Sequence, residues 1–136
     1  MRKKIAYSCL AAFIVLVLGI ALCLNSMFPL ARAVVCADVM DITSFSVEYD
    51  NAPIELSELC LGGILVHLKM AEPTRKLSLD DNPSVRPYYK ITVDTNDWQY
   101  RYFIYEQGGA FYLELPYEGI YILNDDVSSL LEQDKS

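Results

Sequence analysis

The sequence predicts an α+β protein: an N-terminal transmembrane helix followed by a small domain with an antiparallel sheet and helices on one of its faces. Three observations predict this class. An uncharged apolar run of twenty residues spans 5–24, directly after Arg2, Lys3 and Lys4. Alternating and helical patterns then follow in the order strand, helix, three strands, helix. Short turns separate the three consecutive strands, which favours an antiparallel meander.

The N-terminal run is long enough to cross a membrane, because a twenty-residue helix rises about 30 Å. Basic residues before it place the N-terminus in the cytoplasm and the C-terminal domain outside the cell. We therefore expect residues 1–33 to be a signal anchor that contacts the lipid bilayer through residues 5–24. The alternative is a signal peptide, because Ala31-Arg32-Ala33 has the small-x-small pattern of a cleavage site. Cleavage near Ala33 would give a secreted protein.

The domain itself is expected over residues 42–133, after a connector at 34–41 and before a tail at 134–136. Its first strand begins at Ile42, where Phe45, Val47 and Tyr49 alternate with polar residues. A helix follows from Glu58 to about Ala71, capped by Ser57. Its double glycine, Gly62-Gly63, suggests close packing against another element.

Three strands are expected after a polar segment that spans residues 72–87, an ordered loop or a weak edge strand. They cover 88–94, 98–106 and 110–115, and the turn between the last two contains Gly108 and Gly109. A short helix capped by Asn124 should close the domain.

The segment Pro116 to Tyr121, PYEGIY, has two interpretations. It is either a corner that docks the last helix on the sheet, with Gly119 at a positive φ, or a surface groove. In the groove, Tyr117, Glu118 and Tyr121 would contact a partner.

Aromatic residues lie on both faces of the strand at 98–106. Trp98, Tyr100 and Tyr102 share one face, and Phe103 and Tyr105 share the other. One set belongs to the core. The other set is either an exposed surface that binds peptides or glycans, or a cross-strand ladder of rings that stabilises the sheet.

Charge excludes nucleic acid as a partner. Removing Arg2, Lys3, Lys4 and Arg32 leaves seven basic residues against eighteen acidic ones beyond Ala33, a formal charge of about −11. Phosphates would be repelled by this charge, whereas a cationic ligand would be attracted. The same charge also serves solubility alone.

No catalytic, metal or cofactor motif is present in the sequence. His67 is the only histidine, which rules out a multi-histidine metal site. Glu114 and Glu118 could form a glycosidase-like pair, but their separation in space does not follow from their spacing in sequence. The spacing of Cys36 and Cys60 demands no disulfide, and we expect Cys60 to be a buried thiol.

The segments PTRK (73–76) and PYEGIY (116–121) resemble a bacterial family catalogued as a domain of unknown function, whose members are small exported Gram-positive proteins. The resemblance covers about residues 42–131. The double glycine and His67 depart from the family pattern, and the lipobox of some relatives is missing. The resemblance implies location and architecture, and it assigns no residue a catalytic role.

We therefore expect a membrane-tethered extracytoplasmic module, without enzymatic activity, that binds a peptide, a protein or a cell-envelope component. Its candidate ligand-binding residues are Tyr117, Glu118 and Tyr121, with Arg75 and Lys76 as a second polar patch. One alternative is a hydrolase of envelope material that uses clustered carboxylates. Another is an immunity-like protein whose acidic surface neutralises a cationic toxin.

Overall fold

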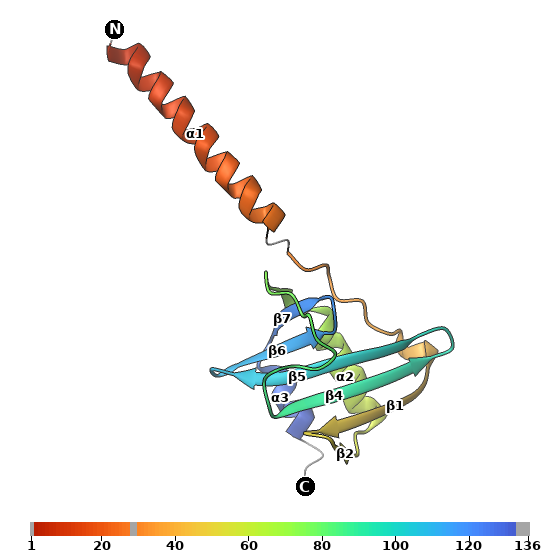
Figure 1. Ribbon diagram of the computed structural model, residues 1–136. Helices are drawn as coiled ribbons and strands as arrows, with labels where there is room; N and C mark the ends of the chain where they lie inside the picture. The colour runs from red at the N-terminus through yellow and green to blue at the C-terminus, as the bar shows by residue number, and fades with distance from the viewer. Residues whose placement is uncertain (1, 28–29, 133–136) are drawn as a thin grey trace. The chain divides into compact units, whose positions relative to one another are not determined.

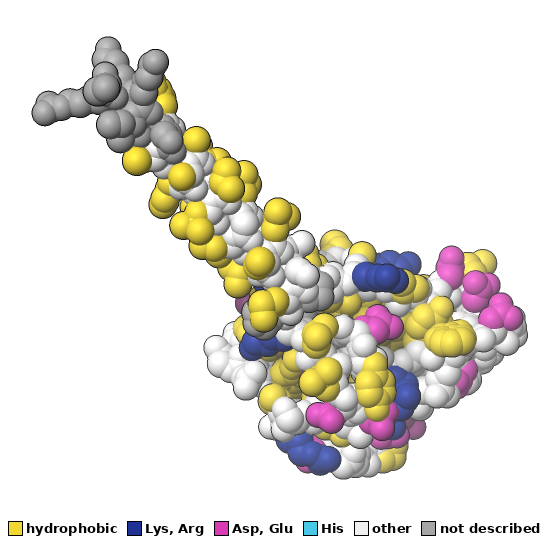
Figure 2. Space-filling view, turned by 45° about the horizontal axis from the view of Figure 1, so that its top comes forward, with side chains coloured by type: hydrophobic (Ala, Val, Ile, Leu, Met, Phe, Trp, Pro, Cys, Tyr) yellow, Lys and Arg dark blue, Asp and Glu magenta, His cyan; other side chains and the backbone are white. Residues whose placement is uncertain are grey.

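The computed structural model describes residues 2–27 and 30–132, and the chain divides into two compact units after Leu30. The first unit is the helix α1, Arg2–Met27. Within it, Cys9–Met27 is long and apolar enough to cross a membrane, by length and composition. Figure 2 shows hydrophobic side chains projecting along this helix. The expected tail at 134–136 lies outside the described residues.

The second unit is an antiparallel sheet with two α-helices (Figure 1). The sheet order is β2-β1-β4-β5-β6-β7-β3. The elements are η1 Val39–Asp41, β1 Ile42–Tyr49, β2 Ala52–Ile54, α2 Glu58–Lys69, β3 Glu72–Pro73, β4 Tyr88–Thr95, β5 Gln99–Gln107, β6 Ala110–Leu115, β7 Gly119–Leu123 and α3 Asp126–Glu132. The α+β class and the antiparallel sheet are confirmed, but the sheet has seven strands where four were expected.

Two of the additional strands arise where turns reverse the chain more tightly than expected. Asp50 and Asn51 have φ of +46° and +71°, so the chain returns from Tyr49 as the short strand β2. After Pro116, the Glu118 N–H donates to the Leu115 carbonyl at 3.1 Å, and the chain returns as β7. Residues 116–118 of the PYEGIY segment are therefore a turn between two paired strands, and residues 119–121 belong to β7, so the segment is not a corner leading to the last helix.

The main core lies between one face of the sheet and the two helices, which Figure 1 shows on the same side of the strands. Leu65 and Leu68 of α2 and Leu131 of α3 are buried there. The sheet residues that meet them come from alternate positions of successive strands: Val47, Tyr89, Ile91, Val93, Tyr102, Ile104, Leu113, Leu115, Tyr121 and Leu123. One of the two alternating side-chain sets of each of these strands therefore belongs to the main core.

The opposite face of the sheet is covered by the loop between β3 and β4, which crosses in front of the strands in Figure 1. Phe103 and Tyr105 are buried beneath it. Tyr105 stacks on Tyr112 with ring centroids 5.8 Å apart, and Tyr88 meets Phe103 edge-on at 5.4 Å. The second aromatic set of β5 is therefore a buried ring ladder, and it offers no exposed binding surface.

Residues of the expected connector are part of the folded unit, which begins at Ala31. Val34 and Ala37 are buried, and the Ala37 N–H donates to the Tyr102 hydroxyl at 3.1 Å. The Tyr121 hydroxyl donates to the Arg32 carbonyl at 2.8 Å. These contacts place the domain boundary about ten residues before the expected start at Ile42.

Cys60 is buried and Cys36 is half-buried, and both hold thiols without a disulfide. Burial raises the pKa of the Cys36 thiol. The expectation of a buried thiol at Cys60 agrees with this placement.

Gly119 is required for close packing rather than for a positive φ. A Cβ at this position would lie 2.8 Å from the Ala31 Cβ. We expect Gly119→Ala to lower the free energy of unfolding by about 1–3 kcal/mol, because the extra methyl overpacks the contact. Ala31→Gly should restore most of the loss in the double variant, as measured by urea denaturation.

Gly62→Ala is the matched control, because a Cβ at Gly62 would meet nothing within 4 Å. This substitution lies within α2 and should stabilise the domain by about 0.5–1 kcal/mol. An equal loss of stability in both alanine variants would contradict the close-contact explanation.

Candidate functional site

The candidate site arises from the unequal lengths of β5 and β6. β5 pairs with β4 from Gln99 onward, but it pairs with β6 only from Phe103 onward. β6 ends at Leu115, where Pro116 cannot donate a ladder hydrogen bond and the chain turns. Among the described residues, the first part of β5 therefore has a strand neighbour on one side only.

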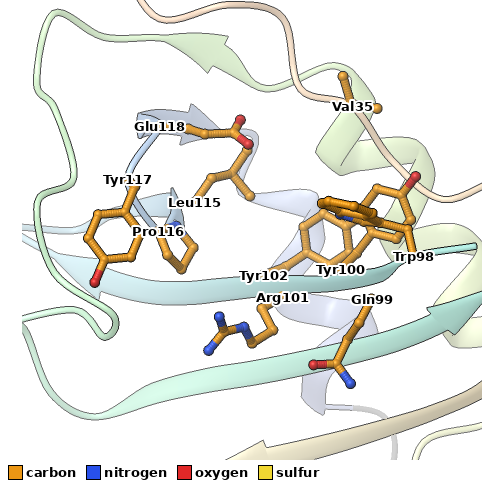
Figure 3. A pocket seen from close by; sticks show the side chains of 10 residues that line it. All are labelled: Val35, Trp98, Gln99, Tyr100, Arg101, Tyr102, Leu115, Pro116, Tyr117 and Glu118. Atoms are coloured by element: carbon orange, nitrogen blue, oxygen red, sulfur yellow. The ribbon is translucent and has the colours of Figure 1, made fainter.

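The space beside this part of β5 is a cavity of about 430 Å³, which we call the β5 slot. Figure 3 shows Trp98 and Tyr100 at one end of the slot, and Pro116 and Tyr117 at the other. The residues that line it are Val35, Trp98, Gln99, Tyr100, Arg101, Tyr102, Leu115, Pro116, Tyr117 and Glu118.

Trp98 leaves most of its ring in solvent, with 68% of the residue exposed. Its backbone is held by the β4–β5 hairpin: the Thr95 N–H donates to the Trp98 carbonyl at 2.8 Å, and the Trp98 N–H donates to Thr95 Oγ1 at 3.1 Å. Tyr100 and Tyr102 stack beside it with ring planes 4° apart. The hairpin thus presents an ordered aromatic surface at one end of the slot.

Tyr117 provides the second exposed ring, with 65% of the residue exposed. Its φ of +62° lies in the left-handed region, which a tyrosine adopts only at an energetic cost. A hydrogen bond to the Asp81 carboxylate, aided by desolvation, raises the pKa of the Tyr117 hydroxyl. The Tyr117 hydroxyl is therefore the donor of this bond.

Carboxylates surround both ends of the slot. At the Tyr117 end, Asp80 and Asp81 contribute to the raised pKa of the Tyr117 hydroxyl. Glu118 lines the slot itself. At the other end, a smaller cavity lined by Trp98 and Tyr100 also contains the acids Asp38, Asp41 and Asp97. Arg101 is the one basic residue among those that line the slot. The charged residues around the slot are therefore mostly acidic.

The predicted site residues separate into three places. Tyr117 and Glu118 line the slot. Tyr121 is fully buried on the helix-covered face of the sheet, so it cannot contact a surface partner and is removed from the candidate site. Arg75 and Lys76 are exposed on the loop between β3 and β4, outside the slot.

A second cavity, of about 300 Å³, lies beneath that loop, and Lys76 lines it together with Glu114. The Ser78 hydroxyl donates to Glu114 Oε1 at 2.7 Å, and both residues are buried. Burial, and to a lesser extent Glu114, raises the pKa of Tyr105. The Glu114 carboxylate is thus held by hydroxyl donors from the loop and the sheet, an arrangement that fastens the loop.

Glu114 and Glu118 do not line a common cavity: Glu114 lines the space beneath the loop, and Glu118 lines the slot. The described residues contain no cluster of three or more His, Cys, Asp or Glu side chains that could hold a metal ion. The slot itself combines aromatic rings, one arginine and one carboxylate. This composition suits binding by contact and hydrogen bonding.

Sequence reasoning missed Gln99 and Arg101 as site residues, and it considered Trp98 only as a member of one of the two aromatic sets, either of which could have been the exposed one. Their role depends on where β6 stops along β5, which is a long-range property of the sheet. The sequence did contain a signal for an unpaired strand edge. The expected strand at 98–106 is longer than its neighbour at 110–115, so part of the longer strand must lack a partner on that side.

Comparisons with known proteins address the fold and the family. No curated protein matches the chain. An NMR structure of a protein from Ruminococcus gnavus is similar, with a TM-score of 0.55 and 24% identity, covering 71% of this chain and 99% of that one. This likeness supports the fold alone. Residues 34–122, more than half of the chain, match the model of a family described as "Domain of unknown function (DUF5300)". The chain therefore belongs to this family.

Proposed function

We propose that the protein is a membrane-tethered extracytoplasmic module that binds a polypeptide ligand in the β5 slot and catalyses no reaction. The observation that carries the proposal is the exposure of two large rings, Trp98 and Tyr117, at opposite ends of one cavity. Tryptophan and tyrosine are enriched among the residues that dominate binding energy in protein interfaces. Their exposure here leaves apolar area available for a ligand to bury.

The tether is supported by the length of α1 and by the contacts of the segment that follows it. Cleavage after Ala33 would remove the Arg32 carbonyl that accepts from Tyr121, and Ala31, whose N–H donates to the Thr74 carbonyl at 3.4 Å. Cleavage would therefore cost the folded domain both hydrogen bonds, which favours an uncleaved anchor. The intact mass should therefore correspond to a chain that keeps its N-terminal segment, and a mature protein that starts at Val34 would contradict the anchor.

The two segments that we propose as family hallmarks bond directly to each other. Thr74 of PTRK donates through its hydroxyl and its N–H to the Ile120 carbonyl of PYEGIY, at 2.6 and 3.0 Å. The Ile120 N–H donates to the Lys76 carbonyl at 3.1 Å. These hydrogen bonds fix the position of the β6–β7 turn that carries Tyr117 beside the slot. The direct bonding of the two segments supports the proposal that they belong to one shared exported module.

The binding test uses the full-length chain in lipid nanodiscs and a displayed library of random short peptides. Trp98→Ala and Tyr117→Gly should each reduce the recovery of selected peptides by about tenfold or more, because each removes an exposed ring that a bound peptide would bury. Glycine is chosen at Tyr117 because it accepts the left-handed backbone without strain.

Leu59→Ala is the matched control, since Leu59 is 87% exposed on α2 and does not line the slot. It should leave peptide recovery unchanged, and circular dichroism should show the same fold for all variants. Equal recovery with Trp98→Ala, Tyr117→Gly and the control would contradict slot binding.

A further inference from the structure

We infer that the ligand of the β5 slot is an extended peptide, basic at alternate positions, which adds to the free edge of β5 as a further β strand. This inference rests on the proposed function and specifies its ligand and binding mode. It follows from three properties of the slot: the direction of its peptide groups, its position in the sheet, and its charge.

The peptide groups of Gln99 and Arg101 face the slot. The Trp98 carbonyl accepts from Thr95 on β4, and the N–H and C=O of successive strand residues point alternately to the two sides. Gln99 and Arg101 therefore direct these groups away from β4. Within the described part of the chain, no hydrogen bond reaches them from that side, and both residues are exposed.

The slot continues the path of β6 beyond the point where β6 turns away. β6 pairs with Phe103 of β5 and ends at Leu115, so the position next to Gln99–Tyr102 is a strand position without a strand. A peptide segment of about four residues, at about 3.3 Å per residue, matches this length. Peptide backbone has the donor and acceptor spacing that such an edge requires, whereas the peptide groups of a helix are already bonded to each other.

The charged residues around the slot determine which side chains the added strand is expected to carry. Trp98 and Tyr100 lie on the helix-covered face of β5, and the smaller cavity that they line also contains Asp38, Asp41 and Asp97. Alternate side chains of the ligand would point to this face. A lysine or arginine there would form ion pairs with the carboxylates and cation–π contacts with the aromatic rings. The intervening side chains would share the face of Arg101, whose charge disfavours a basic residue directly beside it.

The peptide test uses the full-length chain in nanodiscs and labelled peptides of alternating lysine and valine. The lysine peptide should bind at least about tenfold more tightly than its glutamate counterpart, and added salt should narrow the difference. N-methylation then identifies the binding mode, because only one alternating set of peptide N–H groups faces β5. Methylation of that set should weaken binding by about tenfold, and methylation of the other set by no more than about threefold.

The protein variants separate backbone from side-chain recognition at the same residue. Arg101→Pro removes the backbone N–H of residue 101, which faces the slot and is bonded to no strand of the sheet. The ligand loses one backbone hydrogen bond, so binding should weaken by about tenfold. Arg101→Ala keeps this N–H and removes the one positive charge of the slot lining, so the lysine peptide should bind this variant at least as tightly as the unaltered protein. If Arg101→Pro fails to fold, the two N-methylated peptides test the same hydrogen bonds on unaltered protein.

The outcomes distinguish this inference from the proposed function. Equal effects of the two methylation sets, or equal binding of lysine and glutamate peptides, would overturn strand addition. If the lysine peptide does not bind but the library still yields peptides that depend on Trp98 and Tyr117, strand addition alone is overturned. If no selected ligand depends on these rings, both proposals are overturned.

Discussion

Tyr121→Ala is expected to lower the free energy of unfolding by about 3–5 kcal/mol, a large share of the stability of a small domain. The side chain is fully buried between the sheet and the helices, and its hydroxyl donates to the Arg32 carbonyl at 2.8 Å. The substitution leaves a cavity and an unpaired carbonyl. Urea denaturation followed by circular dichroism measures the loss.

Tyr121→Phe is the matched control, because it keeps the ring and removes only the hydroxyl. It should cost about 1 kcal/mol, the usual value of one hydrogen bond. Ile122→Ala, at the next and exposed position of β7, should cost less than Tyr121→Ala. If Tyr121→Ala were as stable as Tyr121→Phe and yet lost peptide binding, the original assignment of Tyr121 to the ligand site would be restored.

Alkaline pH is expected to destabilise the domain steeply, because three tyrosines are protected from ionisation in the folded state. Burial is the main cause that raises the pKa of Tyr102, Tyr105 and Tyr121. In the unfolded chain a tyrosine ionises near pH 10. The stabilisation is therefore fully present below about pH 10, and it is lost as the pH rises from there toward the raised values.

Each tyrosine that remains protonated only in the folded state contributes a slope of about 1.4 kcal/mol per pH unit. Urea denaturation from about pH 9 to about pH 11 should show the decline. Tyr102→Phe and Tyr105→Phe should each make the decline shallower, because each removes one ionising group from the unfolded chain. A stability that stays constant over this range would contradict the protected burial of these residues.

Local patterns predicted much of the fold. Ser57 accepts from the Cys60 N–H at 3.2 Å and α2 starts at Glu58, because capping involves only neighbouring residues. The three meander strands lie within about one residue of their expected bounds, since alternation and the intervening turns are local signals. The period of two also divided the aromatic residues of β5 correctly between its two faces, although it did not identify which face meets the helices.

The β6–β7 turn shows where local reasoning failed. The positive φ expected at Gly119 is found at Tyr117, and Gly119 begins a strand that Ala31 approaches closely. That contact joins residues far apart in the chain, so no local pattern records it. Tyr121 was assigned to the surface for the same reason, because its burial depends on β7 pairing with both β6 and β3.

The sequence by itself determined the apolar N-terminal helix, the α+β class, the acidic character of the domain and the residues that alternate toward its core. Composition and short periods suffice for these properties. Only the tertiary structure decided which rings remain exposed, and that Trp98 and Tyr117 border the same slot beside an unpaired part of β5. The physical reason is that strand pairing joins distant segments, and the place where β6 stops along β5 determines which peptide groups remain available to a ligand.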